Sequence, residues 1–145
     1  KRPIMVHRAI LGSMERFVGG LIEHFGGRFP LWCAPVQVAL VPIREEHAAY
    51  CKQLEARLHD ELFRVDAKLH PGHMNNKIKE AQHDKVPFML IAGDREAAEG
   101  TVAVRRRDTR EQVVMPFEEF LALIVDLRKR RALDLGETAE ARVVG

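Results

Sequence analysis

Two short and almost wholly apolar runs, residues 36–43 and 86–92, set the strongest limit on the fold of this chain. A strand with one face in water alternates apolar and polar residues, whereas a strand covered on both faces is apolar along its whole length. Strands of this second kind are typical of parallel sheets with helices on either side. The two runs therefore predict a layered α/β fold.

The segments around these runs show the periodicity of helices or of strands. Apolar residues at helical spacing predict helices over residues 13–24 and 45–62 and another that starts at residue 116, while residues 75–83 predict a polar helix. Further strands are expected at residues 3–7, 63–67, 101–107 and 112–115, with a short helical or turn insert at 95–99. We expect a mixed, mostly parallel sheet of about five strands flanked by helices, with an antiparallel hairpin over residues 101–115.

Composition shifts divide the chain into three parts. Residues 1–33 form a strand–helix piece, residues 34–132 form a compact domain, and residues 133–145 lack a periodic apolar face and are expected to form a flexible tail. The opening residues run straight into an apolar stretch, so we expect a fragment of a longer protein. No apolar run is long enough to span a membrane, and no signal peptide is recognisable.

Cysteine usage and charge limit the partners. Cys33 and Cys51 match no zinc-ligand pair and predict two buried, reduced thiols in a cytoplasmic protein. The net charge is only +2, but arginines cluster at 105–107 with Arg110, and a second basic run covers residues 128–131. The second run is typical of a helix C-terminus, where cations meet the helix dipole. The first is compatible either with a solvated face or with a nucleic-acid surface.

Three motifs follow one another along the chain. Residues 7–17 have the sequence HRAILGSMERF, residues 29–32 and 34–38 have FPLW and APVQV, and a third group consists of KVPFML at 85–90, GDRE at 93–96 and GTVAVR at 100–105. In this order and spacing they resemble motif 3 and the anticodon-binding domain of threonyl-tRNA synthetases, which are class II enzymes. The resemblance extends from residue 2 to about residue 131. It implies that residues 1–33 are the end of a catalytic domain and that residues 34–132 bind an anticodon.

The resemblance also implies roles in the first motif. Arg16 would lie against ATP, where a planar guanidinium can stack on adenine and hold phosphate oxygens, and Ser13 would lie near the adenylate. His7 would be one of three zinc ligands, of which the other two lie outside this chain. Zinc with an open position can take the amino and hydroxyl groups of threonine and so reject valine. The full enzyme would need ATP with Mg²⁺ and zinc, and would act as a homodimer on threonine and its tRNA.

In the second half, the resemblance points to four residues near the anticodon. Glu96 and Arg105 match the positions that read the middle anticodon base, a guanine in every threonine anticodon. A carboxylate can accept from guanine N1–H and N2–H, and a guanidinium can donate to O6. Lys85 and Lys77 match basic positions near the anticodon loop. Without the resemblance, Glu96 would be taken for a solvated turn residue and Arg105 for a side chain on an edge strand.

One segment departs from the family pattern. Where the family carries Asp-x-Arg-Asn-Glu, this chain has residues 68–76, and Pro71 replaces an asparagine that helps to read the anticodon. Proline offers no backbone donor. Two other classes of function remain open at this point: a non-catalytic paralogue that uses the domain for RNA or protein binding, and a small nucleotide- or flavin-binding protein. The last would need a glycine-rich strand-to-helix turn, whereas Gly26 and Gly27 follow a predicted helix.

We predict that the isolated 145-residue chain neither threonylates tRNA nor holds zinc tightly, because the remaining catalytic residues and zinc ligands lie elsewhere. A threonylation assay and a measurement of bound zinc on the purified chain check this. Turnover, or one tightly held zinc ion per chain, would contradict it.

Overall fold

The computed structural model describes residues 3–109 and 111–135. In chain order its elements are α1 (Met14–Phe25), η1 (Leu31–Cys33), β1 (Val38–Pro42), η2 (Glu45–His47), α2 (Ala48–Asp60), β2 (Val65–Ala67), α3 (Met74–His83), β3 (Phe88–Ala92), α4 (Asp94–Glu99), β4 (Thr101–Arg106), β5 (Gln112–Pro116) and α5 (Phe117–Arg130). Here η marks a short 3-10 helix. Of the predicted tail, residues 136–145 lie outside the described part of the chain, whereas Leu135 packs in the core.

The strands form one sheet in the order β2-β1-β3-β4-β5. β1 pairs in parallel with β2 and with β3, and the β1–β3 register runs from Val38 opposite Phe88 to Pro42 opposite Ala92. β3–β4 and β4–β5 are antiparallel, which confirms the predicted hairpin. The sheet is mixed, as expected, but it is not mostly parallel, because β3–β4 and β4–β5 are both antiparallel. Short connections after β3 return the chain directly alongside itself, and such connections can join only antiparallel strands.

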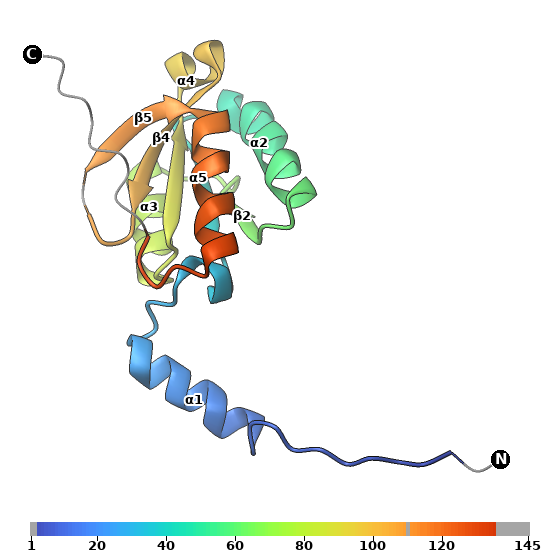
Figure 1. Cartoon of the computed structure of the whole chain (residues 1–145). Coiled ribbons are helices and arrows are strands. Elements are labelled where there is room, and N and C mark those ends of the chain that lie inside the picture. The colour runs from blue at the N-terminus through green and yellow to red at the C-terminus, as the bar shows by residue number, and fades with distance from the viewer. Residues whose placement is uncertain (1–2, 110, 136–145) are drawn as a thin grey trace, which may run out of the picture.

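Helices cover both faces of the sheet. Strand alternation sends Val38, Leu40, Phe88 and Leu90 toward α2 and α5, and it sends Ala39, Val41, Met89 and Ile91 toward α3. Figure 1 shows α2 and α5 side by side in front of the sheet. Because β1 and β3 lie between two helical layers, every residue of both strands is buried. Their lack of polar alternation follows from that position.

α1 and the residues before it stand apart from this core. The predicted strand at residues 3–7 does not form, because a strand needs a neighbour for its backbone hydrogen bonds, and here Ile4 is 93% exposed. α1 itself is capped at both ends, with Ser13 accepting from Arg16 N–H and Gly26 at φ 56. Its expected buried face is exposed, however, and none of its residues is buried. Figure 1 shows the helix extending away from the sheet.

A polar network anchors the segment that joins α1 to β1. Gln37, buried between them, donates from Nε2 to the Leu31 carbonyl at 2.8 Å and accepts the Arg64 N–H at 2.9 Å. The Arg64 guanidinium donates to the Ala34 carbonyl at 2.7 Å. These bonds satisfy groups that would be costly to bury without partners. Side chains therefore add to the backbone bonds at the entry into β1, where Gln37 N–H also donates to the Arg64 carbonyl at 2.8 Å.

Two simple physical features complete the fold. Within the described ranges, no helix has both the length and the apolar character needed to cross a bilayer. Both cysteines are free: Cys51 is buried and Cys33 is only partly buried, although both were expected to be buried. Burial raises the pKa of the Cys51 thiol to about 11, while the positive charge of Lys77 opposes the rise.

We predict that the two thiols react in sequence. In the native chain at pH 8, a thiol-specific disulfide reagent should modify Cys33 first, because the buried Cys51 with a pKa of about 11 supplies almost no accessible thiolate. Spectroscopic counting of reacted thiols should give one fast group in buffer and two in urea. Two equally fast groups in buffer would show that the β1–α2 core is open.

We also predict that Phe120→Ala lowers the free energy of unfolding by about 3–5 kcal/mol, because a buried aromatic ring leaves a cavity. The Phe120 ring is fully buried and packs edge-on against Phe88, with ring centroids 5.5 Å apart. Urea denaturation measures the change. The exposed neighbour Glu119→Ala is the matched control and should change stability by less than about 0.5 kcal/mol. Equal losses in the two variants would contradict the assignment of the core.

Candidate nucleic-acid interface

The short helix α4 begins directly where β3 leaves the sheet. Its N-terminus is closed by Glu96, whose Oε2 accepts the Gly93 N–H at 3.0 Å. Gly93 itself is tightly enclosed, since a Cβ added there would lie 2.7 Å from Ile43 Cδ1. A larger residue at this position would force the end of the Ile43 side chain to move. The result is a half-exposed carboxylate held at the carboxyl end of a buried strand.

A buried histidine connects this turn to the segment after β1. His47 Nδ1 accepts the Arg44 N–H at 3.2 Å, so the ring proton lies on Nε2, which donates to Asp94 Oδ1 at 2.9 Å. That hydrogen bond lowers the pKa of Asp94 below its ordinary value. The parallel pairing of β1 with β3 brings the two residues together, because the carboxyl ends of parallel strands meet at the same edge of the sheet.

The same cluster could be mistaken for a metal site. One ligand atom from each of Glu46, His47 and Asp94 lies within 4.8 Å of the others. The Arg44 guanidinium already supplies the positive charge, with Nη1 at 3.1 Å from Glu46 and 3.8 Å from Asp94. A metal at His47 Nε2 would also move the ring proton to Nδ1, against the Arg44 N–H. The geometry favours a structural ion-pair cluster.

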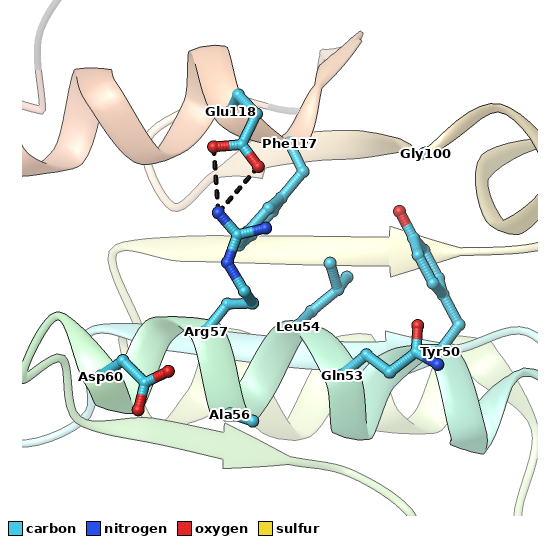
Figure 2. A pocket seen from close by; sticks show the side chains of 9 residues that line it. All are labelled: Tyr50, Gln53, Leu54, Ala56, Arg57, Asp60, Gly100, Phe117 and Glu118. Atoms are coloured by element: carbon cyan, nitrogen blue, oxygen red, sulfur yellow. Dashed lines mark hydrogen bonds and ion pairs between the residues drawn. The ribbon is translucent and has the colours of Figure 1, made fainter.

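The other end of α4 is connected to α2. Tyr50 Oη donates to the Thr101 carbonyl at 2.8 Å, one residue after Gly100 ends the helix at φ 67. Figure 2 shows the Tyr50 ring pointing from α2 toward this turn. Tyr50 also lines one end of a pocket of about 470 Å³ between α2 and α5. At the other end Arg57 reaches Glu118 with Nη2 at 2.8 Å from Oε1, as Figure 2 shows.

The face of β4 that points away from α2 and α5 carries two unsatisfied polar atoms. Alternation places Thr101, Ala103 and Arg105 on this face. Thr101 Oγ1 and Arg105 Nε are both buried, and within the described residues neither has a hydrogen-bond partner. On the neighbouring strand, Val114 lies opposite Ala103 and is 59% exposed. Ala103 itself is only 8% exposed, so this face is exposed at Val114 of β5 and not along β4, where Arg105 Nε is a buried donor that lacks an acceptor.

The four residues predicted to contact the anticodon divide between two ends of this region. Glu96 follows the carboxyl end of β3, and Lys77 lies in the first turns of α3, which starts at the same edge of the sheet. Arg105 pairs with Met89 near the start of β3, and Lys85 lies just before that strand. No contact between described residues joins Glu96 to Arg105. The structure thus places two of these residues at each end of the region and does not form one cluster of four.

The two lysines are less available than the resemblance implied. Lys77 is only 4% exposed, on the face of α3 that packs against the sheet. Lys85 Nζ donates to the Gly26 carbonyl at 2.5 Å and so contacts the end of α1. In this structure, Lys85 contributes to the attachment of α1. An RNA phosphate would have to compete with that contact.

The arginine cluster is likewise mixed in its roles. Arg107 Nη1 donates to the Phe29 carbonyl at 3.0 Å and to the Lys85 carbonyl at 3.2 Å, which makes it a structural residue. Arg110 lies outside the described residues. The second basic run ends α5, as predicted, and Arg128 lies over the Phe63 ring at 4.4 Å. Arg105 is therefore the residue of the first cluster whose buried donor is still unsatisfied.

The residues predicted for catalysis lie on the separate N-terminal part. His7, Ser13 and Arg16 are all exposed. Ser13 Oγ accepts the Arg16 N–H at 3.5 Å and donates to Glu15 Oε2 at 2.5 Å, so here it serves as an N-cap. Among the described residues, no metal-binding group includes His7. A single imidazole does not make a zinc site, and this chain alone does not fit the metal.

Sequence reasoning missed His47, Asp94 and Tyr50. A usable signal was present, because His47 and Asp94 each follow a buried run that predicted a parallel strand. Residues at the carboxyl ends of parallel strands are the usual place for functional side chains in α/β sheets. Tyr50 gave no such signal, since its partner is a backbone carbonyl.

Comparison with known proteins gives consistent results. A family model described as "Anticodon binding domain" matches residues 37–127. The chain is 45% identical over 133 residues to a threonine–tRNA ligase of Symbiobacterium thermophilum, which covers 92% of this chain and 20% of that protein. It is 46% identical over 131 residues to the threonine–tRNA ligase of Thermus thermophilus, with 90% and 20% covered. The chain thus spans about one fifth of the length of these relatives.

A solved structure shows the same fold. The RNA binding domain of threonyl-tRNA synthetase from Cryptosporidium parvum Iowa II superposes with a TM-score of 0.76 and is 31% identical. The superposition covers 95% of this chain and 33% of the other.

Proposed function

Because the chain belongs to the family of anticodon-binding domains, we propose that it is the C-terminal part of a threonine–tRNA ligase and that it binds the anticodon of the threonine tRNA. Specific RNA recognition usually targets splayed bases in loops through their Watson–Crick edges. The chain offers a carboxylate, an unsatisfied guanidinium donor and the exposed Val114 on the neighbouring strand for such a base. The alternative of a non-catalytic paralogue gains no support from any contact described above.

The observation that carries this proposal is the buried Arg105 Nε, which has no hydrogen-bond partner among the described residues. Buried donors in native proteins are nearly always paired, so an orphan of this kind points to a missing acceptor. Guanine O6 is such an acceptor, and Arg is the side chain that most often donates to it. The outward face of β4 leads from this donor to the turn that carries Glu96.

The positions of Glu96 and Arg105 limit how a base can lie. Thr101 and Arg105 are four residues apart on β4, which is about 13 Å at ~3.3 Å per residue. We place the middle guanine toward the exposed Val114 of β5, because Ala103 on β4 is only 8% exposed. Glu96 would accept from N1–H and N2–H at one side, and Arg105 would donate to O6 from the other.

The catalytic contribution is proposed from the resemblance and from the exposure of α1. In the full enzyme, Arg16 would bind ATP and stabilise charge on its phosphates during adenylate formation, and Ser13 would cap the helix that presents it. Zinc would supply selection of threonine by its hydroxyl group, with His7 as one ligand, but the remaining ligands are not in this chain. We further propose a cytoplasmic homodimer, in keeping with the two free thiols.

Glu96→Gln tests base reading with little disturbance of α4, because the amide oxygen can still accept the Gly93 N–H. We expect the variant to discriminate less between a threonine anticodon stem-loop and the same loop with its middle guanine replaced by adenine. The expected loss is about 1–3 kcal/mol, or roughly 5-fold to 150-fold in the ratio of dissociation constants. Binding of both loops is measured by fluorescence anisotropy at a stated salt concentration.

The matched control is Glu99→Gln, an exposed carboxylate on the same helix with the same change in charge. It should leave the ratio unchanged. If the unmodified chain binds both loops equally, only the electrostatic attraction to phosphates remains, and the proposed reading of the anticodon is wrong.

A further inference from the structure

We propose that His47 and Tyr50 are positioning residues that set the place of Glu96 by fixing the two ends of α4. The inference deepens the proposed function and rests on it. Neither residue would touch RNA. Their effect would be on specificity, because base contacts specify whereas phosphate contacts chiefly position and attract.

The first step concerns α4 itself. The helix has six residues, and none of them is buried. A helix this short is unstable in isolation, and helices in proteins owe most of their stability to tertiary packing. With no core contact of its own, α4 depends on what holds its ends. An unheld α4 would let the Glu96 carboxylate move relative to β4.

His47 holds the start of the helix. Its ring is 4% exposed and is itself oriented by the Arg44 N–H at Nδ1, so its Nε2–H has a fixed direction. That donor meets Asp94, the first residue of α4, at 2.9 Å. Glu96 lies two residues further on and returns to the Gly93 N–H. The Glu96 carboxylate, which is proposed to read the base, is thus two residues from a contact that is anchored in the core.

Tyr50 holds the end of the helix. Its ring packs against the core that α2 and α5 form, and its hydroxyl donates to the Thr101 carbonyl at 2.8 Å. The left-handed Gly100 joins α4 to this carbonyl, and its own carbonyl accepts the Phe117 N–H at 3.3 Å, so the Tyr50 bond adds to the pairing of β4 with β5. Figure 2 shows the Tyr50 hydroxyl directed at the turn. His47 and Tyr50 lie three positions apart, so one segment after β1 holds both ends of α4.

The experiment compares Tyr50→Phe, His47→Leu and His47→Gln in the 145-residue chain. Tyr50→Phe removes only a hydroxyl, and His47→Gln keeps a donor near the position of Nε2. Gln53→Ala is the control, because this neutral, exposed residue lines the same pocket on α2 without contacting the α4 turn. For each variant we would measure binding of the two stem-loops, amide hydrogen exchange of residues 94–99, and the melting temperature.

Tyr50→Phe and His47→Leu should each reduce the binding ratio by about threefold to tenfold, the effect of one net hydrogen bond. Affinity for the adenine loop should stay unchanged. Exchange in α4 should accelerate in both variants, while His47→Gln and Gln53→Ala should stay close to the unmodified chain. An unchanged ratio and unchanged exchange in a folded Tyr50→Phe chain would overturn the inference, as would an equal fall in Gln53→Ala.

The two proposals can fail separately. Equal binding of both loops by the unmodified chain would refute the reading of the middle base, and this inference with it. A chain that discriminates, and keeps its ratio in both Tyr50→Phe and His47→Leu, would refute the positioning role alone.

Discussion

The parallel pairing of β1 with β3 is the constraint on which the rest of the structure depends. It aligns Val38–Pro42 with Phe88–Ala92 in register, and both strands are buried along their whole length. Such a pair cannot be joined by a tight turn, so α2, β2 and α3 must lie between the two strands in sequence. Those elements then supply the helical layers on the two faces. The burial of β1 and β3 and the strand order of the sheet therefore both follow from the parallel pairing of these two strands.

The same pairing explains why functional side chains gather at one edge. Both strands end at that edge, and the segments that follow them, η2 and α4, lie side by side. The contact between His47 and Asp94 spans 47 positions of sequence. The two residues lie close together in space only because β1 and β3 end at the same edge of the sheet. The antiparallel strands β4 and β5 then extend the sheet, and they leave Val114 of β5 exposed beside the buried, unsatisfied Nε of Arg105.

Much of this could be predicted from the sequence, for reasons that are local. The apolar runs and the helical periodicity placed β1, β3, α2, α3 and α5, because burial on one or both faces leaves a direct trace in residue order. The errors came from features that depend on a neighbour. Residues 3–7 carry strand-like residues but no partner strand, and the apolar stripe of α1 has no surface to pack on. The contact of Tyr50 depends on the tertiary arrangement and left no trace in the sequence, whereas His47 and Asp94 were marked only by their places after buried runs.

The isolation of α1 has a consequence for how changes in this protein would act. None of its side chains is buried, so they contribute little to the free energy that keeps the sheet domain folded. A damaging substitution on the apolar stripe of α1, such as one at Phe17 or Ile22, would leave the sheet domain melting at its usual temperature. A screen of this chain that follows only thermal stability would therefore miss functional defects in α1.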